Sequence, residues 1–219
     1  MTAYGPADVI AVDGPSGTGK STVSRAVARA LGWRYLDTGA MYRAATWLVL
    51  QAGVPVEQAS ALVRRHGLQV GTDPEIEDVV AMGRHVEAAI RSPEVTAAVS
   101  AVSAVPELRS LLVDLQRAAI GAGRIVVEGR DIGSVVVPDA RLQVYLTAEP
   151  DVRAVRRAQE TAGDAAATGA ALRRRDALDG SRAASPLRPA PHAVVVDSTA
   201  LTQEQVVEHI LTLARLVLT

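Results

Sequence analysis

The feature that most constrains this chain is a glycine-rich segment that contains its only lysine, Lys20. The segment spans residues 14–21, reads Gly-Pro-Ser-Gly-Thr-Gly-Lys-Ser and fits the pattern GxxxxGK[ST]. In this pattern the backbone N–H groups turn inward around phosphate oxygens, the lysine reaches the outer phosphates and the last hydroxyl is placed for magnesium. The segment therefore predicts a loop that binds the phosphates of a nucleotide.

The residues on either side of the loop agree with this prediction. Residues 9–12 form a short apolar run, typical of a buried parallel strand. After the loop, apolar residues recur at helical spacing from Val23 to Leu31, and Gly32 ends the helix. Strand, loop and helix thus come in the order that points a helix N-terminus at phosphate groups. The alternative is an ordinary glycine turn with a surface lysine, which would not need these flanks.

The rest of the chain predicts an α/β fold. Four further apolar segments are expected strands, at residues 34–36, 125–127, 142–146 and 193–196. Helical patterns separate most of them, and they include a helix that opens at Pro106 and a last helix that starts at a capping box, Thr202 to Gln205. We expect a five-stranded parallel sheet with helices on both faces and an active site at the carboxyl ends of the strands.

Two regions interrupt this alternation. Residues 68–70 and 79–81 predict short strands with a tight turn at Gly83-Arg84, and therefore a small β insert. Residues 163–191 are rich in Ala, Gly, Pro and Arg, which suggests a short basic lid that closes over phosphates; the alternative is a solvated helix followed by a loop. We expect one domain over residues 1–219, with a core of 8–61, 105–156 and 192–219, an insert of about 62–104 and a lid of about 157–191.

Composition narrows the classes of function. The net charge of −1 argues against a general nucleic-acid or membrane-surface binder, and the absence of cysteine excludes disulfides and thiolate metal sites. The N-terminus lacks a basic region before an apolar stretch, so a cytoplasmic protein is expected. The four histidines are scattered without metal-ligand spacing, and we assign surface or packing roles to them: His66, His85, His192 and His209.

Several segments together resemble the bacterial cytidylate kinases, in the nucleoside monophosphate kinase group of P-loop kinases. They are residues 13–20, 35–43 (Tyr-Leu-Asp-Thr-Gly-Ala-Met-Tyr-Arg), 129–133 (Gly-Arg-Asp-Ile-Gly), 138–140 and 197–199. The resemblance runs from about Val9 to the final helix and includes the β insert. It implies a monomeric enzyme that transfers the γ-phosphoryl group of ATP to CMP or dCMP, with Mg²⁺ and with no nucleic-acid or membrane partner.

The resemblance also implies roles for individual residues. The expected ATP-binding residues, with Ser21 also as the metal ligand, are Gly14, Pro15, Ser16, Gly17, Thr18, Gly19, Lys20, Ser21 and Thr22. The expected CMP-binding residues are Thr38, Arg43, Ser100, Arg109, Arg130, Asp131, Arg175, Asp179 and Arg182. The expected catalytic residues are Lys20, Arg130, Arg175 and Arg182. Among these, Arg43, Arg130 and Arg182 would hold the acceptor phosphate, while Ser100, Arg109 and Asp131 would face the cytosine.

The chemistry of these side chains suits phosphoryl transfer. The reaction depends on in-line positioning and on cancelling negative charge, and the guanidinium fork of arginine matches two phosphate oxygens.

Asp37 follows the second strand, where it either caps the next turn or contacts ligand. A GTPase is excluded because an Asn-Lys-x-Asp guanine reader needs a second lysine. A P-loop kinase for another small acceptor and a non-catalytic nucleotide sensor remain alternatives.

Overall fold

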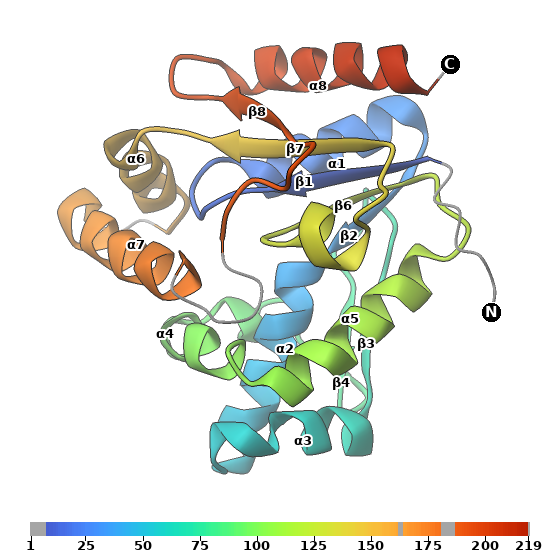
Figure 1. Cartoon of the computed structure of the whole chain (residues 1–219). Coiled ribbons are helices and arrows are strands. Elements are labelled where there is room, and N and C mark those ends of the chain that lie inside the picture. Colours follow the sequence, from blue (N-terminus) through green and yellow to red (C-terminus); the bar gives the residue numbers. More distant parts are fainter. Residues whose placement is uncertain (1–7, 162–163, 181–186, 219) are drawn as a thin grey trace. The chain divides into compact units, whose positions relative to one another are not determined.

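The structure, a computed structural model, describes residues 8–161, 164–180 and 187–218 (Figure 1). The chain divides into two compact units, called here unit 1 (residues 1–35 and 122–219) and unit 2 (residues 36–121). Strand β2, Arg34–Asp37, crosses the boundary between them.

Unit 1 contains the phosphate loop and the main sheet. Its other elements are β1 (Val9–Asp13), α1 (Lys20–Leu31), β6 (Ile125–Gly129), the short π-helical turn η3 (Ile132–Val136), β7 (Leu142–Thr147), α6 (Pro150–Thr161), α7 (Ala165–Gly180), β8 (Val194–Asp197) and α8 (Gln203–Val217). The five-stranded sheet has the order β2-β6-β1-β7-β8, and β1 pairs in parallel with both β6 and β7. The predicted α/β class and the five-stranded parallel sheet are confirmed.

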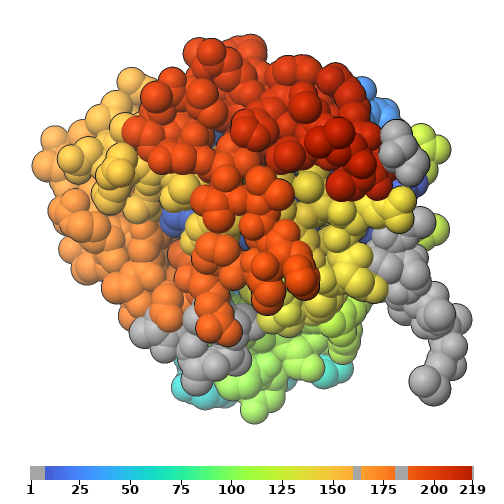
Figure 2. All heavy atoms as spheres, turned by 45° about the horizontal axis from the view of Figure 1, so that its top comes forward, coloured from blue at the N-terminus to red at the C-terminus, as the bar shows by residue number. Residues whose placement is uncertain are grey.

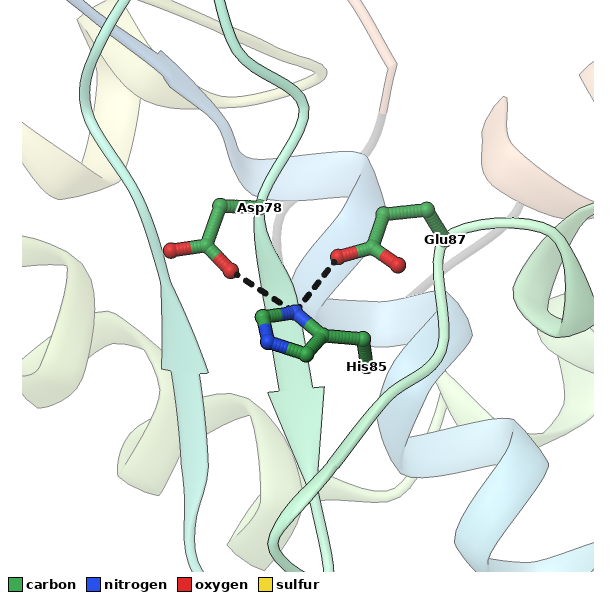
Figure 3. A group of neighbouring side chains, drawn as sticks. All are labelled: Asp78, His85 and Glu87. Atoms are coloured by element: carbon green, nitrogen blue, oxygen red, sulfur yellow. Dashed lines mark hydrogen bonds and ion pairs between the residues drawn. The ribbon is translucent and has the colours of Figure 1, made fainter.

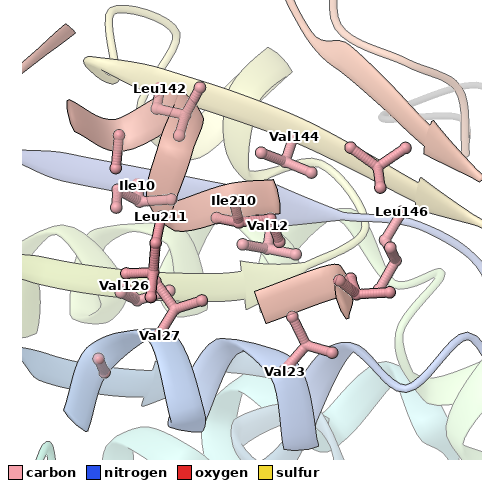
Figure 4. Close-up of a cluster of buried hydrophobic side chains, with 14 of the residues drawn as sticks. Ile10, Val12, Val23, Val27, Val126, Leu142, Val144, Leu146, Ile210 and Leu211 are labelled. Atoms are coloured by element: carbon pink, nitrogen blue, oxygen red, sulfur yellow. The ribbon is translucent and has the colours of Figure 1, made fainter. Parts of the chain in front are cut away.

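One face of this sheet carries the core that fixes the loop in place (Figure 4). Ile10 and Val12 lie on the same face of β1, because successive side chains of a strand point to opposite faces, and both are fully buried. They pack with Val23 and Val27 of α1 and with residues of α8, among them Ile210. Both ends of the phosphate loop therefore start from rigid elements, β1 before it and α1 after it.

Helix α8 begins where the sequence predicts. Thr202 accepts a hydrogen bond from the backbone N–H of Gln205, and the Gln205 side chain accepts one from the backbone N–H of Thr202, which completes the capping box. Figure 2 shows this C-terminal helix, in red, on the surface of unit 1. Within the described residues no single helix is long and apolar enough to span a membrane. Helices α4 (Pro93–Val102) and α5 (Pro106–Ile120) have that length and composition only when taken together, and they are bent by 102° relative to each other.

Unit 2 combines helices with a small sheet. Its elements are α2 (Thr38–Ala52), the 3-10 turn η1 (Val56–Gln58), α3 (Ala59–His66), β3 (Leu68–Val70), β4 (Val79–Ala81), β5 (Arg84–His85), the 3-10 turn η2 (Ala89–Arg91), α4 (Pro93–Val102) and α5 (Pro106–Ile120). Asp37 caps α2, because its Oδ1 accepts a hydrogen bond from the backbone N–H of Ala40 at 2.9 Å. Of the two roles open for Asp37, the structure shows the cap.

The β insert is an antiparallel three-stranded sheet in the order β3-β4-β5. The predicted strands at 68–70 and 79–81 are present, but the turn predicted at Gly83-Arg84 is wrong by one residue. The turn residues are Met82 and Gly83, both with positive φ (53° and 68°), and Arg84 already belongs to β5. A two-residue hairpin turn with positive φ at both positions matches the twist of the flanking strands, and this decides the register.

Candidate active site

The phosphate loop follows β1 directly and touches two neighbouring segments of unit 1. A Cβ atom on Gly14, which has a φ of 148°, would lie 2.0 Å from the carbonyl oxygen of Leu146 in β7. A Cβ atom on Gly17 would lie 2.7 Å from the carbonyl oxygen of Arg153 in α6. Both positions therefore require glycine because another backbone approaches closely. This packing shapes the loop before any nucleotide arrives.

Lys20, at the start of α1, folds back onto its own loop. Its Nζ donates a hydrogen bond to the carbonyl oxygen of Pro15 at 2.7 Å, and the side chain is buried. Burial, followed by the nearby positive charge of Arg130, lowers the pKa of Lys20 below its ordinary value, against the opposing effect of Glu128. The negative charge of an anionic ligand in the loop would oppose this lowering of the Lys20 pKa.

Arg130, directly after β6, is held against the same loop. Its Nη1 donates to the carbonyl oxygen of Gly14 and its Nη2 to the Oγ of Ser16, each at 2.6 Å. Its Nε donates to Oδ2 of Asp179 in α7 at 3.1 Å. The guanidinium thus uses all three of its nitrogens, and it faces the loop that the sequence assigns to the donor phosphates.

Asp13, the last residue of β1, anchors the segment that follows Arg130 and Asp131. Its two carboxylate oxygens accept hydrogen bonds from the backbone N–H groups of Ile132 and Gly133, both at 2.8 Å. Burial raises the pKa of Asp13 to about 6, although these two hydrogen bonds and the charge of Lys20 act in the opposite direction. A single buried carboxylate therefore joins the strand before the loop to the turn η3.

Helix α7 meets the loop through two carboxylates three residues apart. Arg153 of α6 donates from Nη1 to Oδ2 of Asp176 at 2.6 Å and to the carbonyl oxygen of Ser16 at 3.2 Å. Asp179, almost fully buried, receives Arg130. Arg175 lies on the same helix, partly buried and close enough to Lys20 to lower the pKa of that lysine. The expected catalytic residue Arg182 lies outside the described residues.

Unit 2 holds the other expected acceptor residues. Arg43 of α2 is buried and its Nη1 donates to the carbonyl oxygen of Ile90 (3.2 Å) and to Oγ1 of Thr96 in α4 (3.0 Å). Arg109 of α5 donates to the carbonyl oxygen of Ser103 and lies over the ring of Tyr42, 5.4 Å from its centroid. Thr38 is buried at the first position of α2, and Ser100 is half-buried on α4.

Within unit 1, then, the structure brings together Lys20, Arg130, Arg175 and Asp179 at the phosphate loop. Asp131, expected to face the base, is also in this unit and is buried. Ser21 and Thr22 lie exposed in the first turn of α1. The partners of Lys20 and Arg130 are loop carbonyl oxygens, the hydroxyl of Ser16 and the carboxylate of Asp179, which phosphate oxygens can replace. This part of the molecule can therefore bind polyphosphate and neutralise its charge.

Three residues with clear structural roles here were not among those predicted. Asp13 belongs to a segment that carries the resemblance, but its position after an apolar strand gave no specific role. Arg153 is one of several arginines on α6, and only its burial in the folded chain distinguishes it. Arg156, also on α6, donates to both the Oγ and the carbonyl oxygen of Ser198, at 2.9 and 2.8 Å. Nothing local in the sequence marks either arginine.

Comparison with known proteins agrees with this geometry. The chain is 54% identical over 211 residues to a cytidylate kinase of Nocardia farcinica (92% of this chain, 91% of that protein), and 52% identical over 211 residues to one of Streptomyces griseus (94% and 91%). A solved structure of an uncharacterized protein from Eubacterium ventriosum matches the fold with a TM-score of 0.53 at 8% identity, covering 95% of this chain and 98% of that one. The family model described as cytidylate kinase matches residues 10–216. The chain belongs to the cytidylate kinase family.

Proposed function

We propose that this chain transfers the γ-phosphoryl group of ATP to CMP or dCMP, giving ADP and CDP or dCDP. The observation that carries the proposal is the set of cationic side chains gathered at the phosphate loop, in a chain that belongs to the cytidylate kinase family. Phosphoryl transfer needs little covalent work from a protein, because the reaction depends on positioning and on charge stabilisation. No dedicated base is required, since the acceptor monophosphate is already anionic near neutral pH.

In the proposed donor site, residues 14–22 hold the phosphates of ATP. Lys20 leaves the carbonyl oxygen of Pro15, Arg130 leaves the carbonyl oxygen of Gly14 and the hydroxyl of Ser16, and both turn to phosphate oxygens. Arg175 adds a third positive charge. The exchange replaces neutral acceptors by anionic ones, and hydrogen bonds between charged groups are roughly twice as strong as neutral ones.

Magnesium fits the same loop. The hydroxyl of Ser21 is exposed in the first turn of α1, and a hydroxyl oxygen is a hard ligand of the kind that Mg²⁺ prefers. We propose that Ser21 holds the ion together with the donor phosphates. Bound there, the ion would neutralise charge that develops on the transferring group.

For the acceptor, we propose the residues that the family resemblance implies. Arg43 and Arg130, with Arg182, bind the phosphate of CMP, and Thr38, Arg175 and Asp179 complete the monophosphate site. Ser100, Arg109 and Asp131 read the base. Cytosine presents an amino donor at N4 and acceptors at N3 and O2, which complement a carboxylate and a guanidinium. Uracil instead presents an acceptor at O4 and a donor at N3. The monomeric state and the cytoplasmic location stay predictions from the sequence.

A coupled assay of ADP release tests the proposal with CMP, dCMP, UMP, AMP and GMP in turn. We expect high rates with the two cytosine nucleotides, low rates with UMP and negligible rates with the purines, which would overfill the pocket. Arg130→Ala should lower the rate by about 100 to 1,000-fold, the usual cost of removing an electrostatic stabiliser. Arg64→Ala, which changes an exposed arginine of α3, is the matched control.

Each alternative gives a different result in this assay. ATP binding without ADP release on any monophosphate would indicate a nucleotide sensor. ADP release that depends on a sugar acid and not on CMP would indicate a kinase for another acceptor. Either result would overturn the proposed activity.

A further inference from the structure

Three side chains of the β insert converge on one point on the surface of unit 2 (Figure 3). They are Asp78, just before β4, His85, in β5, and Glu87, two residues after it. Each residue offers one possible ligand atom, a carboxylate oxygen or an imidazole nitrogen, and these three atoms lie within 4.8 Å of one another. None of them belongs to the phosphate loop or to the expected acceptor site.

The hairpin register explains the convergence. His85 pairs with Val80 across the β4–β5 ladder, so these two residues share a face of the sheet. Asp78 lies two residues before Val80 and Glu87 two residues after His85, and both therefore point to that same face. The neighbouring residues Val79 and Ala81 point to the opposite face and are buried. The spacing Asp-x6-His-x-Glu on this hairpin thus places two carboxylates and one imidazole together.

The distances favour a shared cation over a shared proton. Nδ1 of His85 lies 3.3 Å from Oδ1 of Asp78 and 3.3 Å from Oε1 of Glu87 (Figure 3). Hydrogen bonds between charged groups are about 2.7–2.9 Å long, and a single N–H cannot point at two carboxylates. A tetrahedral zinc ion with its nitrogen and oxygen ligands at about 2.0–2.2 Å separates neighbouring ligand atoms by about 3.4 Å.

The environment of the two carboxylates also favours binding of such an ion. Oδ1 of Asp78 is shielded from water and accepts no hydrogen bond from the described part of the chain. The backbone of Asp78 is held by Gly71, whose N–H donates to its carbonyl oxygen at 2.8 Å. Oε1 of Glu87 accepts the backbone N–H of Val79 at 2.8 Å, which orients the carboxylate and lowers the pKa of Glu87. Metal-binding carboxylates are commonly oriented by outer hydrogen bonds of this kind.

We propose that Asp78, His85 and Glu87 bind a divalent transition-metal ion of the zinc type, with water as a further ligand. Imidazole with carboxylates suits Zn²⁺ and its neighbours, whereas Mg²⁺ prefers oxygen ligands alone. The exposed position of His85, whose side chain is 74% exposed, leaves the ion accessible to water. The ion clips the start of β4 to the end of β5 and so stabilises the hairpin. This site does not depend on the proposed kinase reaction.

Isothermal titration of Zn²⁺ into the untagged, nucleotide-free full chain tests the site. We expect one equivalent to bind, and Mg²⁺ at the same concentration not to compete. His85→Ala should weaken the affinity by at least about tenfold, as loss of a ligand costs no less than loss of an outer partner. His209→Ala, which changes an exposed histidine of α8, is the matched control and should bind as the parent does. Co²⁺ should give the absorption bands of a tetrahedral site in the parent and in His209→Ala, and not in His85→Ala.

Asp78→Asn and Glu87→Gln keep the shape of each side chain, so they test the ligands without removing the hairpin. Both should weaken Zn²⁺ binding while the far-ultraviolet circular dichroism stays unchanged. Bound Zn²⁺ should also slow hydrogen exchange at the amides of β4 and β5, because a ligand that binds only the folded hairpin stabilises it. The proposal is overturned if Zn²⁺ does not bind, if His85→Ala binds it as tightly as His209→Ala, or if Mg²⁺ displaces it.

Discussion

Replacing Asp13 by asparagine should change how the stability of this protein depends on pH. In the folded chain the carboxyl of Asp13 has a pKa of about 6, whereas its ordinary value is 3.8. The folded state therefore binds more protons than the unfolded state between these two values. By linkage, the contribution of Asp13 to stability is full below pH 3.8 and is lost as the pH rises through 6.

The size of the effect follows from the shift. A difference of roughly two pKa units, at 1.36 kcal/mol for each, amounts to about 3 kcal/mol. The Asp13→Asn variant cannot ionise, so it lacks this dependence. It also turns an amide NH₂ toward the N–H of Ile132 or of Gly133, and the unmatched donor costs about 1–3 kcal/mol. At pH 7 the two effects nearly cancel, and at pH 4 only the cost of the unmatched donor remains.

Urea unfolding of both proteins at a series of pH values measures this. The free energy of unfolding of the parent minus that of Asp13→Asn should fall by about 2 kcal/mol between pH 4 and pH 7, because the other titrating groups are common to both. Asp139→Asn, which changes an exposed aspartate, should show no such trend relative to the parent. Parallel pH profiles of the parent and Asp13→Asn would refute the reasoning that burial dominates the carboxyl of Asp13.

Three further predictions concern the active site. Lys20→Ala should lower kcat by about 100 to 1,000-fold with the fold intact by circular dichroism, and more than a tenth of the parent rate would contradict the proposed donor site. Burial lowers the pKa of Lys20, and the negative charge of bound phosphates should raise it again, so ATP binding near pH 7.5 should take up protons. Equal heats of binding by calorimetry in buffers of different ionisation enthalpy would argue against this proton uptake. Asp131→Ala should lower kcat/KM for CMP far more than for UMP, narrowing a gap of roughly 10⁴-fold, and an equal loss for both would assign Asp131 to the geometry of the site instead.

Much of the fold follows from local patterns. The strand, loop and helix around Lys20, the capping box of α8, the strands of the main sheet, and β3 and β4 of the insert lie where apolar periodicity and capping residues predict; β5 was not predicted. Such features depend on residues a few positions apart, so a sequence carries them directly. The turn between β4 and β5 was misplaced because either of two adjacent dipeptides contains Gly83, and strand pairing decides between them.

The candidate active site likewise has features that follow from the local sequence and features that depend on the tertiary structure. The sequence by itself predicted a phosphate-binding loop that contains Lys20, and its segments that resemble cytidylate kinases predicted arginines for a second phosphate. Only the tertiary structure decided that Arg130 contacts Gly14 and Ser16, that Asp13 anchors η3, that Arg153 joins α6 to α7, and that His85 meets two carboxylates. These contacts join segments through strand order and register, which arise from the packing of the whole chain and leave no mark on the local propensity of any one residue.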